Sequence, residues 1–530
     1  MGGLLCKVCC KKEGERGDAL DALSEEERQQ RLALRRGPGE QGPGKPWAER
    51  VVEEFLQVPA SCSDHANVGF MMWMSTTGFP RIDEADRAIP FCVEPSPIVK
   101  GLKLLQPTDP GADAREALAA LSGGKRVIVG SVRMGYGHHR IAYSALTWAL
   151  EMGLEPYLLD ILAPDCVEAA IVRNMDKQYS RMSRMASRFG GVVDALWGNM
   201  MLKGDINMLR FFMALAEKIR AIMAAIPRDV PVISSHPIIG HIAMACGFKK
   251  VINLIFDNHP QYFVLVPGAM NLVQSPSYFD KLLDMGCPAS HLRVAGHWVS
   301  SDLCLNAVAD SEARIARCNR PELPRRFLVA VGGAGAQKAF LEELLQAMAE
   351  LLRARRMRLF VNCGDHGHIA EAVLKCLGKL GLEWDEVTTS EGTEELCRRE
   401  ELKAVAEPAD WKAVTVLRFD SHFAAFRCTD LVSRIADVLV TKPSELAFFP
   451  VPKLHIRRVG AHEAFSAVRS SELGDGTVEC RTVPHTMKKI GQLIEDRSPL
   501  FLLMNSSIIN AANTKVYEGS RVACECAELI

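Results

Sequence analysis

The sequence predicts an α/β protein with two doubly wound domains that face each other across a cleft. Two observations carry this prediction. From Lys125 onward, short apolar runs typical of buried parallel strands alternate with amphipathic helical stretches. The same alternation starts again at Arg326, so the chain contains two successive units of this kind. Its 530 residues are too many for one ordinary hydrophobic core, which agrees with two domains and additional segments.

Differences in composition divide the chain into five segments. Residues 13 to about 60 are charged and contain the Pro/Gly-rich stretch Pro38–Pro46, which is typical of a linker. Farther on, Gly69–Pro80 is predicted as a buried strand and turn. The predicted segments are, in order, a disordered tail and linker (1–60), an amino-terminal extension of unknown role (61–120), a Rossmann-like amino-terminal domain (121–300), a Rossmann-like carboxyl-terminal domain (301–485) and a mainly helical tail with a weak strand signal at its end (486–530).

Composition limits the classes of partner and compartment. The net charge of −1 provides no overall basic field, so nucleic acid is not an expected partner. The 17 cysteines occur singly or in one terminal cluster, without the two spaced pairs of a metal motif. We therefore expect buried thiols in a reducing, cytoplasmic compartment, and neither a metal nor a cofactor. No run approaches the ~20 apolar residues of a membrane span, so any membrane contact is expected to be peripheral.

The amino terminus, MGGLLCKVCCKK, predicts such a contact. Gly2 fits the start of a myristoylation signal, although Cys6 stands where that signal has Ser or Thr. One acyl chain binds a membrane weakly, whereas a second chain or a basic patch makes the attachment stable. The neighbouring lysines and the cysteines predicted to carry palmitate favour an acylated anchor on the cytosolic face of a membrane over a tail with incidental cysteines. Those cysteines are Cys6, Cys9 and Cys10.

A glycine-rich loop after the first predicted strand, GYGHHR at 135–140, carries the first candidate site. Glycines let the backbone approach a ligand, and the N-terminus of the following helix attracts anions. The third glycine of a dinucleotide fingerprint and the Gly-Lys-Ser/Thr of a nucleotide-triphosphate loop are both absent. An imidazole suits proton abstraction near neutral pH, so His138 or His139 is the candidate base. Gly135, Gly137 and Arg140 are the loop residues predicted to face an acceptor.

Polar residues also follow later strands of the same domain. Asp257 stands at such a strand end and is a candidate to assist the base, and His236, His259 and His297 hold similar places. Asp160 ends the second strand, near where a nicotinamide enzyme has its ribose-binding acid. That alternative therefore stays open.

The second domain holds the candidate phosphate site. GGAGAQ at 332–337 opens a helix after a strand, and its backbone N–H groups suit a diphosphate. After a later strand, Lys442 is a candidate to neutralise phosphate charge, and Ser444 and Glu445 are candidates to hydrogen-bond hydroxyl groups of the ligand. The residues predicted to bind the donor are Gly332, Gly333, Gly335, Gln337, Lys442, Ser444, Glu445, His462 and Glu463.

The order of these motifs resembles that of the GT-B glycosyltransferases, in the branch that contains MurG and monogalactosyldiacylglycerol synthase. GYGHHR loosely matches the G-G-x-G-H loop of that branch, and GGAGAQ matches its G-G-S-x-G-A loop. Ala436–Pro443 matches its A-D-x-x-x-T-K-P segment, and His462-Glu463 resembles its His-Gln pair. The likeness extends over residues 125 to 490, roughly.

The resemblance implies a hexosyltransferase-like enzyme that moves a sugar from a nucleotide diphosphate, of UDP type, to a membrane-associated lipid acceptor. It also implies a hinge near Ser300–Pro324, and an apolar acceptor side with a basic rim near Met200–Ile226. The sequence departs from the family at Ser444-Glu445, where the family has Gly-Gly, at Glu463, and in a shortened ribose-binding helix. A GT-B-like binding protein without transfer, or a sugar-nucleotide epimerase or hydrolase, therefore remains an alternative.

Overall fold

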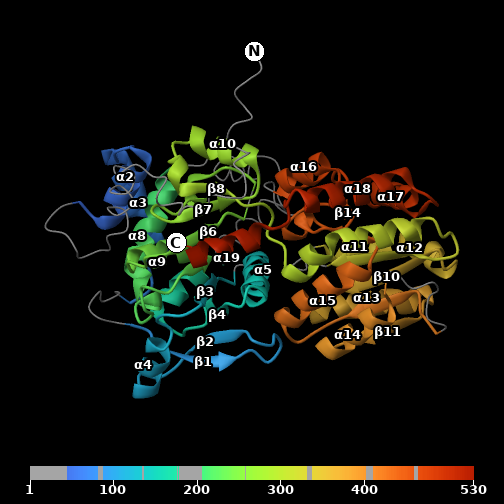
Figure 1. The fold of residues 1–530 in the computed structure, drawn as a ribbon, viewed down its shortest axis with the longest axis horizontal. Coiled ribbons are helices and arrows are strands. Elements are labelled where there is room, and N and C mark those ends of the chain that lie inside the picture. Colours follow the sequence, from blue (N-terminus) through green and yellow to red (C-terminus); the bar gives the residue numbers. More distant parts are fainter. Residues whose placement is uncertain are drawn as a thin grey trace, which may run out of the picture.

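The computed structural model describes residues 45–80, 88–133, 136–175, 177, 206–256, 258–330, 337–401, 410–458 and 463–529. Two α/β domains lie side by side, the amino-terminal one at the left of Figure 1 and the carboxyl-terminal one at the right. Each contains its own sheet with helices packed against it. The predicted fold class, two doubly wound domains, is confirmed.

The amino-terminal sheet has the strand order β1-β2-β4-β3-β5-β6-β7-β8, and only the β1–β2 pair is antiparallel. Its central strands β5 and β6 are buried along their whole length because helices cover both faces of a parallel sheet. From β3 the chain first adds β4 on one side and then β5 on the other side of β3. The carboxyl ends of β3 and β5 therefore form a topological switch point. The strands are β1 (Phe91–Pro95), β2 (Lys103–Pro107), β3 (Arg126–Ser131), β4 (Glu155–Asp160), β5 (Val232–Ser234), β6 (Val251–Leu254), β7 (Met270–Val273) and β8 (Leu292–Val294).

Two helices of this domain, α5 and α9, begin at the switch point. Helix α5 follows β3, and α9 follows β5 and begins with Pro237 after the N-cap residue His236. The main helices are α2 (Trp47–Leu56), α3 (Cys62–Thr76), α4 (Ala112–Ala119), α5 (Gly137–Glu151), α8 (Ile206–Ile219), α9 (Pro237–Ala245) and α10 (Pro276–Asp284).

The carboxyl-terminal sheet is entirely parallel, in the order β11-β12-β10-β9-β13-β14. Its switch point lies between β9 and β13. The strands are β9 (Arg325–Ala330), β10 (Met357–Asn362), β11 (Trp384–Val387), β12 (Val414–Leu417), β13 (Val438–Thr441) and β14 (Lys453–His455). The helices are α11 (Ser301–Cys318), α12 (Lys338–Arg353), α13 (Gly367–Leu380), α14 (Ser390–Arg399), α15 (His422–Ile435), α16 (Ala464–Leu473), α17 (Val483–Ile494) and α18 (Pro499–Asn513).

Residues 61–120, predicted as a separate extension, instead join the amino-terminal domain. β2 pairs with β4, so β1 and β2 continue the main sheet, and the expected boundary at residue 121 divides one sheet. Gly69–Pro80 is not a buried strand, because its first part lies in α3, which packs on α8. In α3 the apolar residues lie around the helix, with Met71 and Met72 partly buried against the core, and Ser75 is its one buried residue.

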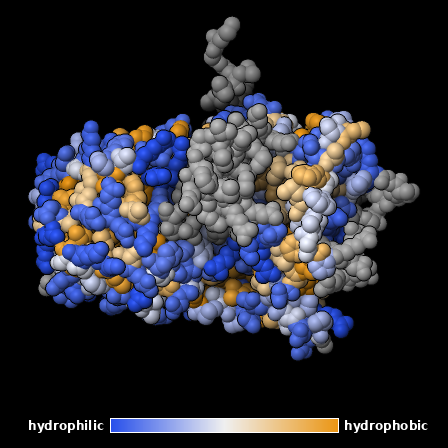
Figure 2. Space-filling view, turned by 180° about the vertical axis from the view of Figure 1, so that it is seen from behind, coloured by the Kyte–Doolittle hydropathy of each residue, from blue (hydrophilic) through white to orange (hydrophobic). Residues whose placement is uncertain are grey.

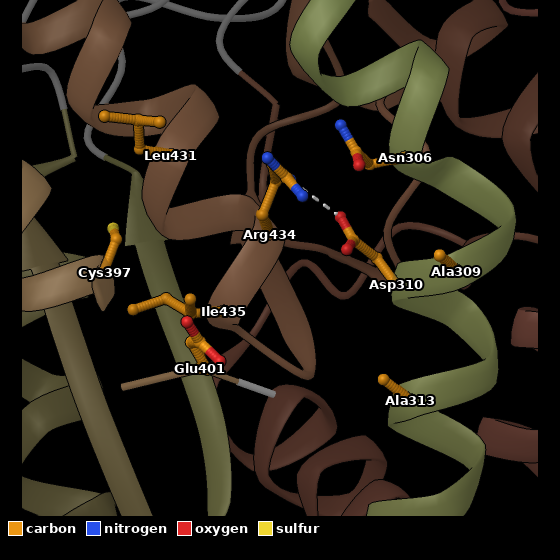
Figure 3. A pocket seen from close by; sticks show the side chains of 9 residues that line it. All are labelled: Asn306, Ala309, Asp310, Ala313, Cys397, Glu401, Leu431, Arg434 and Ile435. Carbon is orange, nitrogen blue, oxygen red and sulfur yellow. Dashed lines mark hydrogen bonds and ion pairs between the residues drawn. The ribbon is translucent and has the colours of Figure 1, made fainter. Parts of the chain in front are cut away.

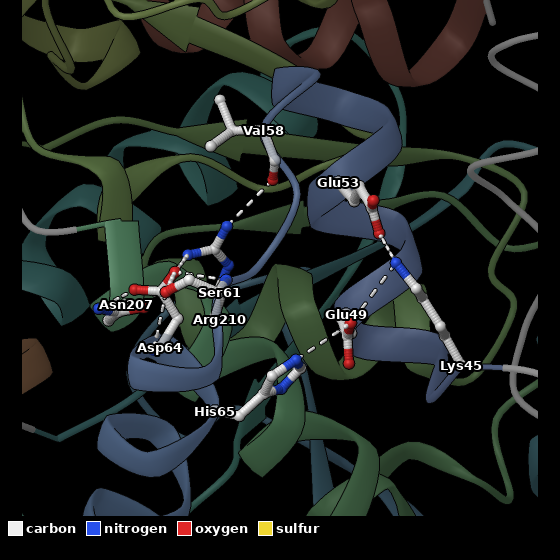
Figure 4. Close-up of polar contacts among 9 residues, drawn as sticks. All are labelled: Lys45, Glu49, Glu53, Val58, Ser61, Asp64, His65, Asn207 and Arg210. Atoms are coloured by element: carbon white, nitrogen blue, oxygen red, sulfur yellow. Dashed lines mark hydrogen bonds and ion pairs between the residues drawn. The ribbon is translucent and has the colours of Figure 1, made fainter.

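The start of α3 is held on α8 by a polar cluster (Figure 4). The backbone N–H of Ser61 donates to the Asp64 carboxylate at 2.8 Å, and the Asn207 amide donates to it at 2.9 Å. Arg210 lies 3.3 Å from the same carboxylate and donates to the Val58 carbonyl at 3.0 Å. The hydrogen bonds from Ser61, foremost, lower the pKa of Asp64 to about 2. The helix is therefore fixed in direction although most of its surface faces solvent.

The chain crosses between the domains twice, and the two crossings pair with each other. The His297 N–H donates to the Val516 carbonyl at 2.7 Å, and the Gly519 N–H donates to the His297 carbonyl at 3.0 Å. After the second crossing, α19 (Gly519–Leu529) returns to the amino-terminal domain and packs on α5, as the red helix among green strands in Figure 1 shows. The weak strand signal at the end of the chain therefore lies in a helix.

The stretch expected to contain the hinge is mostly regular structure. Ser301–Cys318 forms helix α11, which packs on α18 and α15 of the carboxyl-terminal domain. The chain passes between the domains immediately before this helix, at the paired crossings. The residues near Met200–Ile226 expected to form an apolar acceptor side also differ from expectation where the structure describes them. The apolar side chains of α8 pack inward on α2, α3 and α9.

We predict that Gly519→Ala destabilises the protein by about 1–3 kcal/mol, because overpacking against backbone cannot relax cheaply. A Cβ at this position would overlap the Gly296 carbonyl and lie 2.7 Å from the His297 oxygen. The measurement is the free energy of unfolding in urea. Gly378→Ala is the matched control, because nothing lies within 4 Å of its Cβ and alanine favours a helix. Equal effects of the two substitutions would contradict the crossing contact.

Candidate functional site

The switch points of the two sheets meet at the domain interface. In the amino-terminal domain, the loop after β3 leads into α5, next to the end of β5. In the carboxyl-terminal domain, the residues after β13 lead into the short helix η4 (Glu445–Phe448). Helix α5 contacts η4 directly. The structure thus brings the two predicted groups of site residues together, one from each domain.

His138 lies at the amino-terminal switch point. Its Nδ1 is 3.0 Å from the Ser235 carbonyl oxygen. A carbonyl can only accept, so Nδ1 carries the hydrogen and Nε2 is left as the basic nitrogen. The rings of His236 and Phe256 meet the imidazole edge to face at centroid distances of 4.5 and 4.6 Å. Burial lowers the pKa of His138 to about 4, while Glu445 and the Ser235 carbonyl act in the opposite direction. His138 is therefore a neutral base at pH 7.

His139, the neighbouring candidate, points elsewhere. Its Nδ1 lies 3.1 Å from the Ser131 hydroxyl, and its Nε2 lies 3.4 Å from the Asp160 carboxylate. The side chain is buried, and its ring meets that of His422 from the other domain at a centroid distance of 5.1 Å. Both nitrogens thus face groups of the protein. This arrangement separates the two histidines, which the sequence left as equivalent.

Arg140 contacts the other domain and not an acceptor position. Its guanidinium forms an ion pair with Asp430 and donates to the Phe426 carbonyl at 2.8 Å. It also stacks over the ring of Phe449 at 4.7 Å. Burial lowers the pKa of Arg140 to about 9, so the group stays charged at neutral pH. The role of Arg140 seen here is to join the domains.

Tyr136, just before α5, makes a second link between the domains. Arg133 donates to its hydroxyl at 2.8 Å, and the hydroxyl in turn donates to Asp365 after β10. The Tyr136 ring also lies 5.6 Å from that of His366 and 5.7 Å from that of His422. Sequence reasoning did not find this link. The signal was present, since GDHGH at 364–368 places an acid and two histidines directly after a strand.

Glu445 crosses the interface to α5. A Cβ at Gly137 would overlap the Glu445 carboxylate, so this acid lies directly against the first turn of the helix. Burial alone would raise the pKa of Glu445, but the charge of Lys442, a backbone N–H and the Ser444 hydroxyl together lower it. Glu445 is therefore ionised at neutral pH, beside the positive end of the α5 dipole. It thus lies beside the candidate base of the opposite domain.

The other predicted donor residues stay on the carboxyl-terminal domain. Lys442 and Glu463 form an ion pair that joins the end of β13 to the start of α16. The Gln337 amide donates to the Arg457 carbonyl, which brings the start of α12 next to the chain after β14. Three strand-end segments of this domain therefore converge beside its switch point.

Several predicted site residues cannot be placed in this way. The following lie outside the described residues: Gly2, Cys6, Cys9, Cys10, Gly135, Asp257, Gly332, Gly333, Gly335 and His462. The other histidines at strand ends have separate surroundings. His259 stacks on Phe465 of the opposite domain at 4.9 Å, whereas His297 is enclosed by Phe448 and Tyr517 at the crossing. Among the described residues, no three His, Cys, Asp or Glu side chains come together to hold a metal ion.

A separate cavity of about 340 Å³ lies between α11, α14 and α15 (Figure 3). The Asp310–Arg434 ion pair, 3.1 Å long, extends from one side to the other. Burial raises the pKa of the Cys397 thiol in its wall to about 12, so that thiol is a poor nucleophile. The cavity contains none of the predicted site residues and lies away from the switch points.

Two protein families match the chain. Residues 100–281 match a domain of unknown function, DUF6937, and residues 287–528 match another, DUF6938. The second match begins before β8, so it includes the last strand of the first sheet and both crossings. No curated protein matches the chain in sequence.

Several solved structures resemble the chain at low identity. The MnaA–UDP co-structure from S. aureus shows 13% identity over 76% of this chain and 94% of its own, with a TM-score of 0.39. The UDP-GlcNAc 2-epimerase of Neisseria meningitidis bound to UDP-GlcNAc shows 10% identity over 74% of this chain and 98% of its own, with a TM-score of 0.42. Anabaena Alr3699/HepE in complex with UDP and glucose shows 12% identity over 77% and 99%, with a TM-score of 0.38.

We predict that Asp430→Asn lowers the free energy of unfolding by about 3 kcal/mol, because it leaves the charge of Arg140 buried without its partner. The two side chains are only 8% and 3% exposed. Urea denaturation measures the effect. The matched control is Asp385→Asn, at an ion pair whose lysine, Lys412, is 40% exposed. Loss of such an exposed pair costs at most about 1 kcal/mol. If Asp430→Asn costs no more than the control, the pair does not join the domains.

Proposed function

We propose that this chain is a glycosyltransferase of the GT-B type that transfers a sugar from a nucleotide diphosphate, of UDP type, to an acceptor hydroxyl. One observation carries the proposal: the switch points of two doubly wound domains meet, with the neutral histidine His138 on one side and Lys442 on the other. Ligands of such sheets bind outside the carboxyl ends of strands at the switch point. The donor is thus assigned to the carboxyl-terminal domain and the acceptor to the amino-terminal domain.

On the donor side, Lys442 supplies positive charge at the end of β13, next to Ser444. Nucleotide diphosphates need such charge and backbone N–H groups, both to bind and to leave. In this proposal the segment around 332–337 and His462 completes the diphosphate site, as the resemblance implies. The ion pair with Glu463 sets the direction of the lysine.

On the acceptor side, His138 is the proposed base, and His139 holds the start of α5 in place. The proton of the acceptor hydroxyl moves to Nε2 of His138 while the oxygen bonds to the anomeric carbon. The bond from that carbon to the phosphate oxygen breaks, and its electron pair leaves with the nucleoside diphosphate. Asp257 is the proposed assisting acid, since it follows Phe256, whose ring contacts His138.

One observation favours a second candidate, a sugar-nucleotide epimerase or hydrolase. His138 and Glu445 place a base and a carboxylate at one position, and proton abstraction from a sugar carbon or activation of water uses the same pair. A binding protein without transfer would have no use for that pair. Product analysis with a nucleotide sugar alone distinguishes these reactions, because transfer requires an acceptor and the others do not.

The acceptor is proposed to be membrane-associated because α3 presents an apolar stripe. Phe70, Trp73 and Met74 are 58%, 62% and 47% exposed, and their spacing places them on one side of the helix. Residues 66–80 contain no charged side chain. Figure 2 views the molecule from behind, so that the side with α2 and α3, at the left of Figure 1, is at the right. Pale and orange surface is visible there. The aromatic and methionine side chains suit a lipid surface. No described helix has the length and apolar character to cross a bilayer.

The acylated amino terminus remains part of the proposal. The segment with Gly2 and the three cysteines leads into α2, the helix just before α3. An acyl chain and an apolar stripe would supply the two contacts that stable peripheral binding requires.

We predict that UDP or a UDP-sugar raises the melting temperature, and that Lys442→Ala weakens this binding at least about tenfold through loss of a charge-assisted contact. His138→Ala should keep the thermal shift and lose turnover by about a hundredfold or more. Thermal shift with a panel of nucleotides and a coupled assay for released UDP are the measurements. Lys412→Ala, at a partly exposed ion pair away from the switch points, is the control. No shift with any nucleotide would refute the donor assignment.

We predict that replacing Phe70, Trp73 and Met74 by serine reduces binding to phosphatidylcholine vesicles containing phosphatidylserine at least about tenfold. The background is the full chain with Gly2→Ala and serines at the three amino-terminal cysteines, so that acylation does not contribute. Leu305→Ser removes an exposed leucine from the other domain and serves as the control. Unchanged vesicle sedimentation would contradict the membrane surface. Loss of dimers in light scattering would assign the stripe to self-association.

A further inference from the structure

Glu445 belongs to the carboxyl-terminal domain by sequence but contacts the amino-terminal domain. Its carboxylate lies against Gly137, on the first turn of α5 and one residue before His138. The sequence interpretation placed Glu445 among donor-binding residues on its own domain. The observed position instead gives it a role beside the proposed base.

The groups that face His138 show what this carboxylate contributes. Ser235 and His236 lie against it, Phe256 stacks beside His236 and also meets the imidazole, and His139 follows it on α5. Among the described residues around His138, Glu445 is the carboxylate that acts on it, and Lys442 next to it balances its charge. His236 cannot stabilise positive charge on His138. Its Nδ1 accepts the Ile238 N–H as the cap of α9, and burial lowers its pKa well below the usual value. The charge of Glu445 therefore favours an imidazolium at His138.

We propose that Glu445 is a positioning residue that completes the base at His138, and that it does so only while the two domains are closed on each other. The inference rests on the proposed function, in which Nε2 of His138 takes the proton of the acceptor hydroxyl. As the proton arrives, the fixed negative charge of Glu445 stabilises the new imidazolium. The base is then assembled from residues of two domains, and it loses this support when they separate.

Glycine at position 137 is the structural condition for this contact. Any side chain there would occupy the place of the Glu445 carboxylate. Gly367 is a natural comparison, because it is also the first residue of a helix, α13, and nothing lies within 4 Å of its Cβ. The requirement at 137 therefore comes from the opposite domain and not from the start of the helix.

The first test is Glu445→Gln, which keeps the shape of the side chain and removes its charge. Because the carboxylate raises the pKa of His138, its loss should lower that pKa further, so the acidic limb of the kcat–pH profile moves to lower pH. The value of kcat should fall about tenfold to a hundredfold. The KM for the UDP-sugar should change little. Glu350→Gln, at a side chain that is 86% exposed on α12, is the matched control.

Glu445→Asp keeps the charge and serves as the conservative variant. It should retain the wild-type acidic limb and recover part of kcat. An unchanged kcat and pH profile in Glu445→Gln, or a higher kcat, would overturn the proposal, because the carboxylate would then be inert or would obstruct the site. Failure of Glu445→Asp to restore the limb would overturn it as well.

The second test needs no turnover. Gly137→Ala should push the Glu445 carboxylate away from α5 and lower the melting temperature, whereas Gly367→Ala should leave it unchanged. In a Glu445→Ala background, Gly137→Ala should have no such effect, because the overlapping carboxylate is gone. No loss of stability in Gly137→Ala, or an equal loss in the Glu445→Ala background, would overturn the proposal. If these results hold but no nucleotide binds and no sugar is transferred, the proposed function fails and the interdomain contact stands.

Discussion

The first turn of α5 is the constraint on which the rest of the site depends. Successive residues of a helix point about 100° apart, so three adjacent side chains must face three directions. His138 faces the end of β5, His139 faces Ser131 and Asp160 within its own domain, and Arg140 reaches Asp430 in the other domain. One short run thus supplies the candidate base, its support and the link between domains. Moving any one of them moves the others.

Buried charge at the interface explains why the two domains have a defined relation. A charge removed from water is stable only with a partner, and buried Arg140 has its partner, Asp430, on the opposite domain. The hydroxyl of Tyr136 adds a link from the exposed Arg133 to Asp365. Together with the paired crossings at residues 296–300 and 515–519, these contacts hold the switch points together. The same contacts are the ones that domain opening must break.

Regular structure was largely predictable, and the exceptions have physical reasons. Buried parallel strands read as apolar runs because both faces are covered, so the alternation from Lys125 and from Arg326 led to the correct fold class. The apolar run in Gly69–Pro80 predicts a buried strand, whereas it lies largely in α3, where Phe70, Trp73 and Met74 are exposed. Residues 61–120 were set apart because pairing of β2 with β4 is a long-range event without a local signal. The resemblance implies a hinge near Ser300–Pro324, yet helix α11 occupies most of that stretch.

The sequence by itself determined the two doubly wound units and the strand ends that carry polar residues, because these follow from local periodicity and the handedness of βαβ connections. Only the tertiary structure distinguished His138 from His139, since the environment of a side chain depends on its helical direction and on residues about a hundred positions away. It also moved Glu445 from the donor side to His138, and Arg140 from an acceptor loop to an ion pair. Those relations are contacts between domains, and contacts between domains leave no periodic trace in the chain.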